Sequence, residues 1–211
     1  MPNTQYSVAY KKNVKEVESK LGLKQGKEMT FLEADEQRGN PNFSKGGGFR
    51  VNCQACVVAN ELRRRGFDVS AQENTEKKRN VPYELSHKTE NAWVDKNGNI
   101  PIKLKAGGKF YDVALLKNRI KTFAEMTSEL NELTKDVGRY HIDYVWKGGG
   151  GHIITLERLP NGRMQIFDPQ SGIIYDWANL MKGVNKGRGI NVLRVDDLFA
   201  NTSIINGIVT K

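Results

Sequence analysis

Residues 52–66 read NCQACVVANELRRRG, and this stretch decides the fold. Asn52 is among the residues that best cap a helix N-terminus, and Gly66 suits the left-handed backbone position that follows a helix. The arginines at 63–65 fall in the last turn, where positive charge stabilises the helix dipole. The sequence therefore predicts a helix over residues 52–65 with a thiol in its first turn.

Both cysteines of the chain, Cys53 and Cys56, lie in this helix. On a helical wheel, Cys53 points away from the centre of the apolar stripe and Cys56 lies at its margin. The stripe comprises Ala55, Val58, Ala59 and Leu62. A thiolate in the first turn is stabilised by the positive end of the dipole. We therefore expect Cys53 to be a nucleophile, with Cys56 as the alternative.

Two other interpretations of the cysteine pair stay open at this point. Both thiols are compatible with small buried apolar side chains, and the Cys-x-x-Cys spacing also occurs in redox and zinc sites. Zinc would need two further ligands, and the chain has no second cysteine pair. A thioredoxin-like site would lie in a parallel βαβ unit, which the pattern does not show. No metal and no cofactor are therefore expected.

Outward from this helix, helical spacing gives way to alternating spacing, which indicates an α+β fold. Helices are expected at 6–23, 30–37 (where Thr30 and Glu33 form a capping-box pattern) and 124–133, with a helical turn at 176–182. Strands are expected at 67–71, 140–146, 152–158, 163–167 and 191–195, with a turn at 160–162. The polar stretch 72–107 is expected to be a surface insertion. Residues 1–30 are expected to be a helical appendage on a domain at 31–211.

Two of the expected strands carry a histidine and an aspartate that can act together. His152 follows the glycine-rich run 147–151 and opens one strand, and Asp168 ends the next. Pairing the apolar faces puts Ile154 opposite Asp168 and requires a three-residue turn. A two-residue turn would put Asp168 opposite Thr155, on the wrong face. We expect the first register because it buries the apolar side chains.

The three residue types fit one chemistry. A thiolate beside an imidazole, which a carboxylate holds in one tautomer, is the arrangement of nucleophilic amide hydrolysis. Taken alone, the segment 168–172 is also typical of a plain turn after a strand, because Asp, Pro, Ser and Gly all favour turns. Together with His152 on the matching face and a thiol at a helix start, Asp168 is expected to orient the histidine.

Three segments resemble the papain-fold toxin family of glutamine deamidases. Residues 52–69 resemble its first motif, and residues 151–152 and 167–172 (FDPQSG) are similar to its second and third motifs. Residues 40–43 (NPNF) also look like the lead-in of phage head-protein-associated members, so the likeness extends over about residues 33–175.

The resemblance implies a papain-like fold and a Cys53, His152, Asp168 triad that deamidates a protein glutamine. Papain-like peptidases place a glutamine shortly before the thiol to stabilise the oxyanion. Here the sixth residue before Cys53 is Gly47 and that before Cys56 is Arg50. Support for the oxyanion is therefore expected from backbone N–H groups or from the side chains of Gln54, Gln170 and Asn52. A cysteine peptidase and a non-enzymatic phage-associated structural or adaptor domain are the alternatives.

The net charge of +9 does not indicate nucleic-acid binding. Basic residues alternate with acidic ones along the chain, and no aromatic-flanked basic stripe occurs. No apolar run is long enough to span a bilayer, and residues 1–12 lack a signal-peptide pattern. The two cysteines do not make a disulfide framework. We therefore expect the protein to act in a reducing cytoplasm, with non-classical delivery as one route. We also expect a monomer. The expected partners are a target protein and an immunity protein, with no nucleic acid and no membrane.

Overall fold

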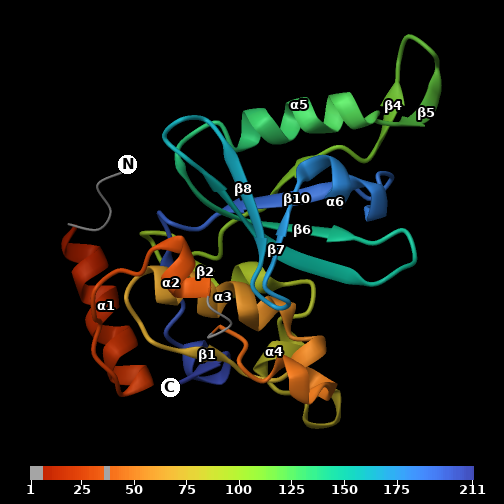
Figure 1. Ribbon diagram of the computed structural model, residues 1–211. Helices are drawn as coiled ribbons and strands as arrows, with labels where there is room; N and C mark the ends of the chain where they lie inside the picture. The colour runs from red at the N-terminus through yellow and green to blue at the C-terminus, as the bar shows by residue number, and fades with distance from the viewer. Residues whose placement is uncertain (1–6, 36–38) are drawn as a thin grey trace.

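The computed structural model describes residues 7–35 and 39–211, which form helices on both faces of an antiparallel sheet (Figure 1). The central sheet has the strand order β3-β10-β6-β7-β8-β9, and each neighbouring pair is antiparallel. One apolar core lies between this sheet and α3, and it also takes in α1. A second core lies on the other face, beneath α5 and α6. The predicted α+β class is confirmed.

The central strands begin and end within two residues of the predicted bounds. They are β6 (Gly138–Val145), β7 (Gly151–Arg158), β8 (Met164–Asp168) and β10 (Ile190–Arg194). The edge strands β3 (Leu104–Ala106) and β9 (Ile173–Tyr175) were not predicted. Three two-stranded pairs complete the sheet structure: β1 (Ser70–Ala71) with β12 (Val209–Thr210), β2 (Trp93–Val94) with β11 (Phe199–Ala200), and β4 (Lys109–Asp112) with β5 (Lys117–Ile120).

Each predicted helix is present in the described residues. They are α1 (Val8–Leu21), α2 (Phe31–Asp35), α3 (Cys53–Arg64), α5 (Phe123–Leu133) and α6 (Trp177–Gly183), and a short α4 (Val81–Glu84) lies in the stretch 72–107. The predicted bounds at residues 6, 36 and 37 lie outside the described residues. The Thr30–Glu33 capping box forms, with Thr30 N–H donating to Glu33 at 2.7 Å and Glu33 N–H donating to Thr30 Oγ1 at 3.3 Å. No helix in the described part of the chain has the length and apolar character needed to span a bilayer.

Helix α3 ends where Gly66 predicts. Gly66 has φ +93°, and its N–H donates to the Arg63 carbonyl at 2.8 Å. The next N–H, from Phe67, reaches back to the Leu62 carbonyl at 3.0 Å, which completes a Schellman motif. A Cβ at position 66 would lie 2.5 Å from the Gly26 carbonyl oxygen, so the chain here requires glycine for two reasons.

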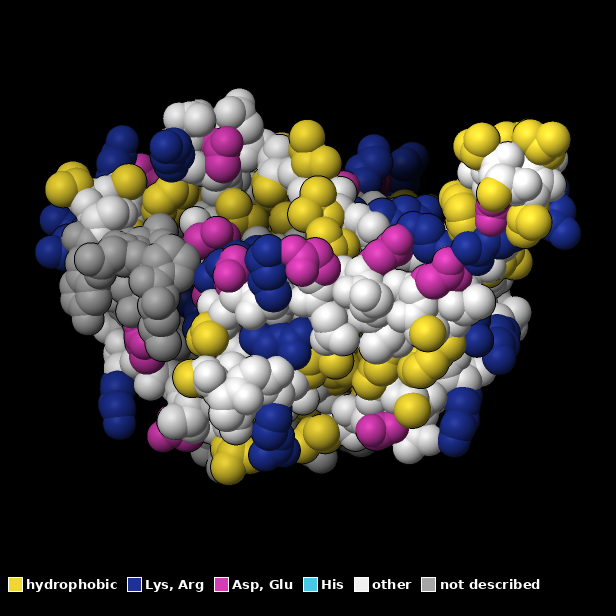
Figure 2. All heavy atoms as spheres, turned by 90° about the horizontal axis from the view of Figure 1, so that it is seen from above, with side chains coloured by type: hydrophobic (Ala, Val, Ile, Leu, Met, Phe, Trp, Pro, Cys, Tyr) yellow, Lys and Arg dark blue, Asp and Glu magenta, His cyan; other side chains and the backbone are white. Residues whose placement is uncertain are grey.

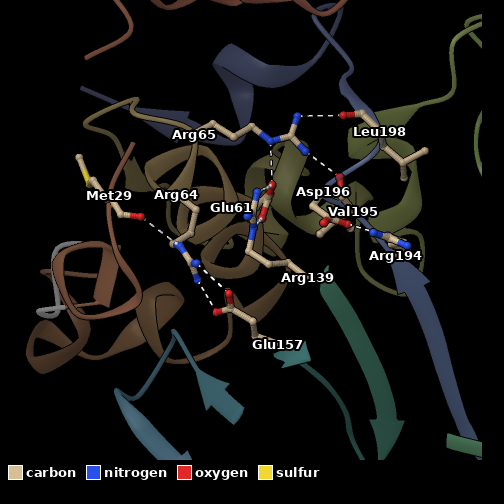
Figure 3. Close-up of polar contacts among 10 residues, drawn as sticks. All are labelled: Met29, Glu61, Arg64, Arg65, Arg139, Glu157, Arg194, Val195, Asp196 and Leu198. Carbon is tan, nitrogen blue, oxygen red and sulfur yellow. Dashed lines mark hydrogen bonds and ion pairs between the residues drawn. The ribbon is translucent and has the colours of Figure 1, made fainter. Parts of the chain in front are cut away.

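The side of α3 opposite its apolar stripe is buried as well. Ten consecutive residues of the helix, from Gln54 to Arg63, are buried. The buried Glu61 carboxylate accepts from Arg65 at 2.7 Å and from Arg139 of β6 at 2.7 and 2.9 Å (Figure 3). Arg64 makes a bidentate pair with Glu157 of β7, at 2.7 and 2.9 Å. The arginine run, expected only to complement the helix dipole, therefore ties the helix to the sheet.

The stretch 72–107 is polar and largely irregular, as predicted, but part of it is internal. Trp93 of β2 is fully buried, and Ala106 of β3 lies in the core beneath α5. Strand β3 pairs with β10 and forms one edge of the central sheet. Polarity predicted a surface position, but these few apolar residues are enough to fix the segment against the sheet.

The hairpin of β4 and β5 projects from the body. Its tip carries exposed Val113, Leu115 and Leu116, and Figure 2 shows hydrophobic side chains gathered on this projecting corner. At the base, Arg119 makes paired bonds to Glu125 of α5 at 2.9 and 2.5 Å. The hairpin is therefore held through polar contacts to α5 and pairs only with itself among the described strands.

The β7–β8 hairpin has the predicted register. Thr155 pairs with Phe167 and Leu156 with Ile166, which sets Ile154 opposite Asp168. Leu159 N–H donates to the Arg163 carbonyl at 2.9 Å, so residues 160–162 form the three-residue turn. Ile154, Leu156 and Ile166 are buried together in the core beneath α5 and α6. Burial of the apolar faces therefore decides the register, and it places His152 and Asp168 on the same face.

Candidate active site

The thiol of Cys53 lies on a cleft of about 610 Å³ between the start of α3 and the ends of β6 and β7. Cys53 is partly exposed. Cys56 is fully buried, and its thiol donates to the Asn52 side-chain oxygen at 3.3 Å. Burial raises the pKa of the Cys56 thiol well above its ordinary value. Of the two cysteines, only Cys53 lines the cleft.

His152 opens β7 beside this thiol. Its Nε2 lies 3.0 Å from Oδ2 of Asp168, and the ring also interacts with the Cys53 thiol. Burial lowers the pKa of the imidazole, but the hydrogen bonds and the charges of Asp168 and Cys53 outweigh burial and raise it to about 10. The Trp146 ring stacks on His152 with 5.8 Å between centroids, which holds the imidazole from its side. The imidazole is therefore held in a fixed orientation, and its raised pKa favours the protonated form.

Asp168 ends β8 and is held by the turn that follows. Its Oδ2 accepts from the Ser171 hydroxyl at 2.7 Å, and its Oδ1 accepts from the Gln170 backbone N–H at 2.9 Å. Burial raises the pKa of the carboxyl, but the bonds from His152, Ser171 and Gln170 outweigh burial and lower it overall. The segment is thus both a turn and the orienter of His152. The contribution of Ser171 was not predicted, although Asp-x-x-Ser is a common local turn pattern.

A buried cluster of side-chain amides joins this turn to the start of α3. The Gln170 amide lies 2.9 Å from the backbone nitrogens of both Asn52 and Cys53, and only its oxygen can accept both hydrogens. Asn40 donates to the Gln170 carbonyl at 3.0 Å. Asn52 occupies the N-cap position, as predicted, but its side chain donates to Asn40 at 3.3 Å and to the Gln72 carbonyl at 2.9 Å. The cap of α3 is therefore Gln170.

Gln54 faces the other wall of the cleft. Its side-chain NH₂ donates to the Pro82 carbonyl at 2.5 Å and to the Ser86 hydroxyl at 3.4 Å, and its oxygen lies 3.5 Å from the Cys53 sulfur. Both hydrogens of that NH₂ group are thus already donated, as are those of Asn52. The predicted support residues Gln54, Gln170 and Asn52 all lie around the thiol, where they fix the start of α3 and the wall beside it.

The remaining walls of the cleft come from segments that the sequence did not connect with the thiol. The loop after α4 contributes Ser86, His87 and Thr89. Strands β3, β6 and β10 form the floor, and the turn at 187–189 forms the far rim. Because these residues come from four separate parts of the chain, no local pattern indicates that they meet.

Comparison with known proteins gives one match. The family described as papain fold toxin 1, glutamine deamidase, matches residues 51–173, which is more than half of the chain and spans Cys53, His152 and Asp168. No curated protein and no solved structure matches the chain. The resemblance inferred from the motifs is confirmed, and with it the papain-like fold and the enzymatic nature of the protein. The chain belongs to the papain fold toxin family of glutamine deamidases.

Proposed function

We propose that this protein deamidates a glutamine side chain of a target protein with Cys53 as nucleophile, His152 as base and Asp168 as orienter. The observation that carries the proposal is the 3.0 Å contact of His152 Nε2 with Asp168, on a ring that lines the same cleft as the Cys53 thiol. Since Nε2 faces the carboxylate, Nδ1 is the nitrogen left for the thiol. Cys56 is excluded from this role by its burial.

Each step of the proposed reaction assigns a proton to His152. At neutral pH the ring already holds the proton that the thiol gives up, because the pKa of His152 is raised to about 10, and the thiolate attacks the carboxamide carbon of the glutamine. The imidazolium then gives its proton to the leaving nitrogen, so ammonia departs and a thioester joins Cys53 to the substrate. Water, deprotonated by His152, attacks the thioester carbon and releases glutamate, and the proton returns to the thiol. Asp168 stabilises the imidazolium in both halves of the reaction.

The oxyanion formed in both attacks needs hydrogen-bond donors. The Cys53 N–H is directed to Gln170, and the N–H groups of Ala55 and Cys56 donate to the Asn52 carbonyl at 2.9 and 3.0 Å. Among the described residues, the backbone N–H of Gln54 in this first turn donates to no carbonyl. We assign the oxyanion to this N–H, which the positive end of the α3 dipole reinforces.

The partners and setting follow from the same proposal. We propose that the protein acts as a monomer on one protein target, in a reducing cytoplasm in which both free thiols persist. An immunity protein that neutralised it would have to cover the cleft at Cys53 or displace His152. We also propose residues 1–30 as an appendage to a catalytic domain at 31–211, although α1 contributes Val17 and Leu21 to the core around α3.

Mass spectrometry of host proteins tests the proposal. Intact protein should convert a target glutamine to glutamate and release ammonia, whereas Cys53→Ala and His152→Ala variants should do neither. The matched control is Cys56→Ala, which should stay active because that thiol does not line the cleft. New chain ends in the target would indicate a peptidase instead. Activity that survives in Cys53→Ala but not in Cys56→Ala would refute the assignment of the nucleophile.

A further inference from the structure

The cleft extends across the sheet, away from the thiol. Its floor follows one row of cross-strand neighbours: Ile153 of β7 pairs with Asp143 of β6, Asp143 with Asn191 of β10, and Asn191 with Lys105 of β3. Adjacent strands lie about 4.8 Å apart, so this row is about 14 Å long. Since His152 is the neighbour of Ile153 in β7, the row runs from the thiol site to Lys105 at the sheet edge.

Along this row the cleft is lined by more basic side chains than acidic ones. Lys103 lies 3.0 Å from Asp143 and 2.8 Å from Glu90, and Asn191 donates to Asp143 at 2.6 Å. The Asp143 carboxylate, which lines the cleft floor, is thus already paired, and it shares the charge of Lys103 with Glu90. Lys105 and Arg188, which line the far end of the cleft, are exposed and form no ion pair within the described residues. The far end therefore presents two free positive charges.

The turn at 187–189 brings the two cations to the same rim of the cleft. Gly189 has φ +72°, and a Cβ there would lie 2.7 Å from Cε of Lys105. The Lys105 side chain therefore lies against the backbone of this turn, and glycine is required there because a Cβ would also lie 2.8 Å from the Ala106 carbonyl oxygen. Arg188 stands in the same turn, and its N–H donates to the Asn185 carbonyl at 3.0 Å. Both positive side chains thus stand on one rim, at the opposite end of the cleft from Cys53.

We propose that the cleft selects a glutamine that has an acidic residue about four positions away in an extended segment of the target. The inference rests on the proposed function. An extended chain advances about 3.3 Å per residue, so about four residues cover the row from the thiol to the two cations. The Asp or Glu carboxylate of the target pairs with Lys105 and Arg188 while the glutamine carboxamide reaches Cys53.

Synthetic peptides test this specificity. Each carries one glutamine, with Glu, Ala or Lys placed four residues before it in one series and four residues after it in another. Ammonia release gives kcat/KM at low salt. Two exposed ion pairs should favour the Glu peptide over the Ala peptide by about five- to tenfold in one of the series. The preference should shrink at high ionic strength, because salt screens charges at a surface.

Charge reversal sharpens the test. A Lys105→Glu, Arg188→Glu variant should prefer the Lys peptide over the Glu peptide. The matched control is the Lys109→Glu, Lys117→Glu variant on the projecting hairpin, which makes the same charge change outside the cleft and should keep the wild-type preference. Equal rates on all peptides overturn the inference and leave the proposed function intact. Absence of ammonia from every peptide overturns both.

Discussion

The side chain of Gln170 caps the helix that carries Cys53. Its amide oxygen lies 2.9 Å from the Cys53 backbone nitrogen, although the two residues are 117 positions apart in the sequence. A helix is usually capped by the residue that precedes it. Here Gln170 belongs to the turn whose backbone N–H also holds Asp168 at 2.9 Å. One short turn therefore fixes the position of the thiol and of the carboxylate together.

This cap predicts the behaviour of a Gln170→Leu variant. Loss of the acceptor leaves the buried N–H groups of Asn52 and Cys53 unpaired, which should cost about 1–2 kcal/mol of unfolding free energy. We expect kcat to fall while KM changes little, because the variant disturbs the thiol rather than substrate binding. Urea denaturation and ammonia release measure the two effects. Gln170→Glu, which keeps an acceptor oxygen, should recover most of the stability; equal stability of the Leu variant and wild type would contradict the cap.

The contact between Asp168 and His152 predicts the pH profile. The pKa of His152 is raised to about 10, so the imidazolium persists at neutral pH and is lost as the pH rises through that value. Asp168→Asn removes the carboxylate whose hydrogen bond and charge raise the pKa of His152. The alkaline decline of kcat/KM should therefore move to lower pH by on the order of 1–3 units, and the rate should fall.

The matched control for this prediction is Asp176→Asn. Asp176 caps α6 by accepting from the Asn179 N–H at 3.1 Å, and Asn caps a helix equally well. Its pH profile should coincide with that of the wild type. If Asp168→Asn also left the alkaline limb in place, the carboxylate would not control the protonation of His152.

The buried carboxylate of Glu61 predicts a large loss of stability. Burial raises its pKa, but Arg139 and Arg65 outweigh burial and lower it well below the usual range, so Glu61 is charged. Glu61→Ala leaves two guanidinium groups without their buried partner and should cost about 3–5 kcal/mol in the free energy of unfolding. Glu132→Ala, which removes the exposed pair with Lys135, should change it by less than about 0.5 kcal/mol. Urea denaturation that gave similar values for both variants would refute the role of Glu61.

His141 predicts a loss of stability in acid. Burial lowers the pKa of its imidazole to about 4, and the ring lies 5.7 Å from that of Trp93. The unfolded chain binds this proton near pH 6.5 and the folded chain only near 4, so stability falls as the pH drops through this window. The loss should approach about 3 kcal/mol. His141→Phe should remove that part of the pH dependence, whereas His87→Asn, at an exposed position, should retain it. The free energy of unfolding, measured from pH 7 to pH 4, distinguishes the two outcomes.

The elements that the sequence predicts correctly depend on neighbouring residues. Gly66 ends α3 because a left-handed backbone position needs glycine, whatever else the chain does. The β7–β8 register follows from the alternation of apolar side chains, because a slip by one residue would expose Ile154 and Leu156. Because alternate residues of a strand lie on the same face, the same alternation predicts that His152 and Asp168 share one face.

The features of the fold and of the site that the sequence did not predict depend on contacts between distant segments. On the helical wheel of α3, Glu61 lies outside the apolar stripe. It is nevertheless buried, because Arg139 of β6 supplies the opposite charge. The cap from Gln170 and the cleft wall from Ser86 and Lys103 depend on how the segments pack, which no local periodicity encodes. The sequence by itself therefore determined where α3 ends and which strand residues share a face. Only the tertiary structure decided how they are held and what surrounds them, because burial and charge pairing depend on residues far along the chain.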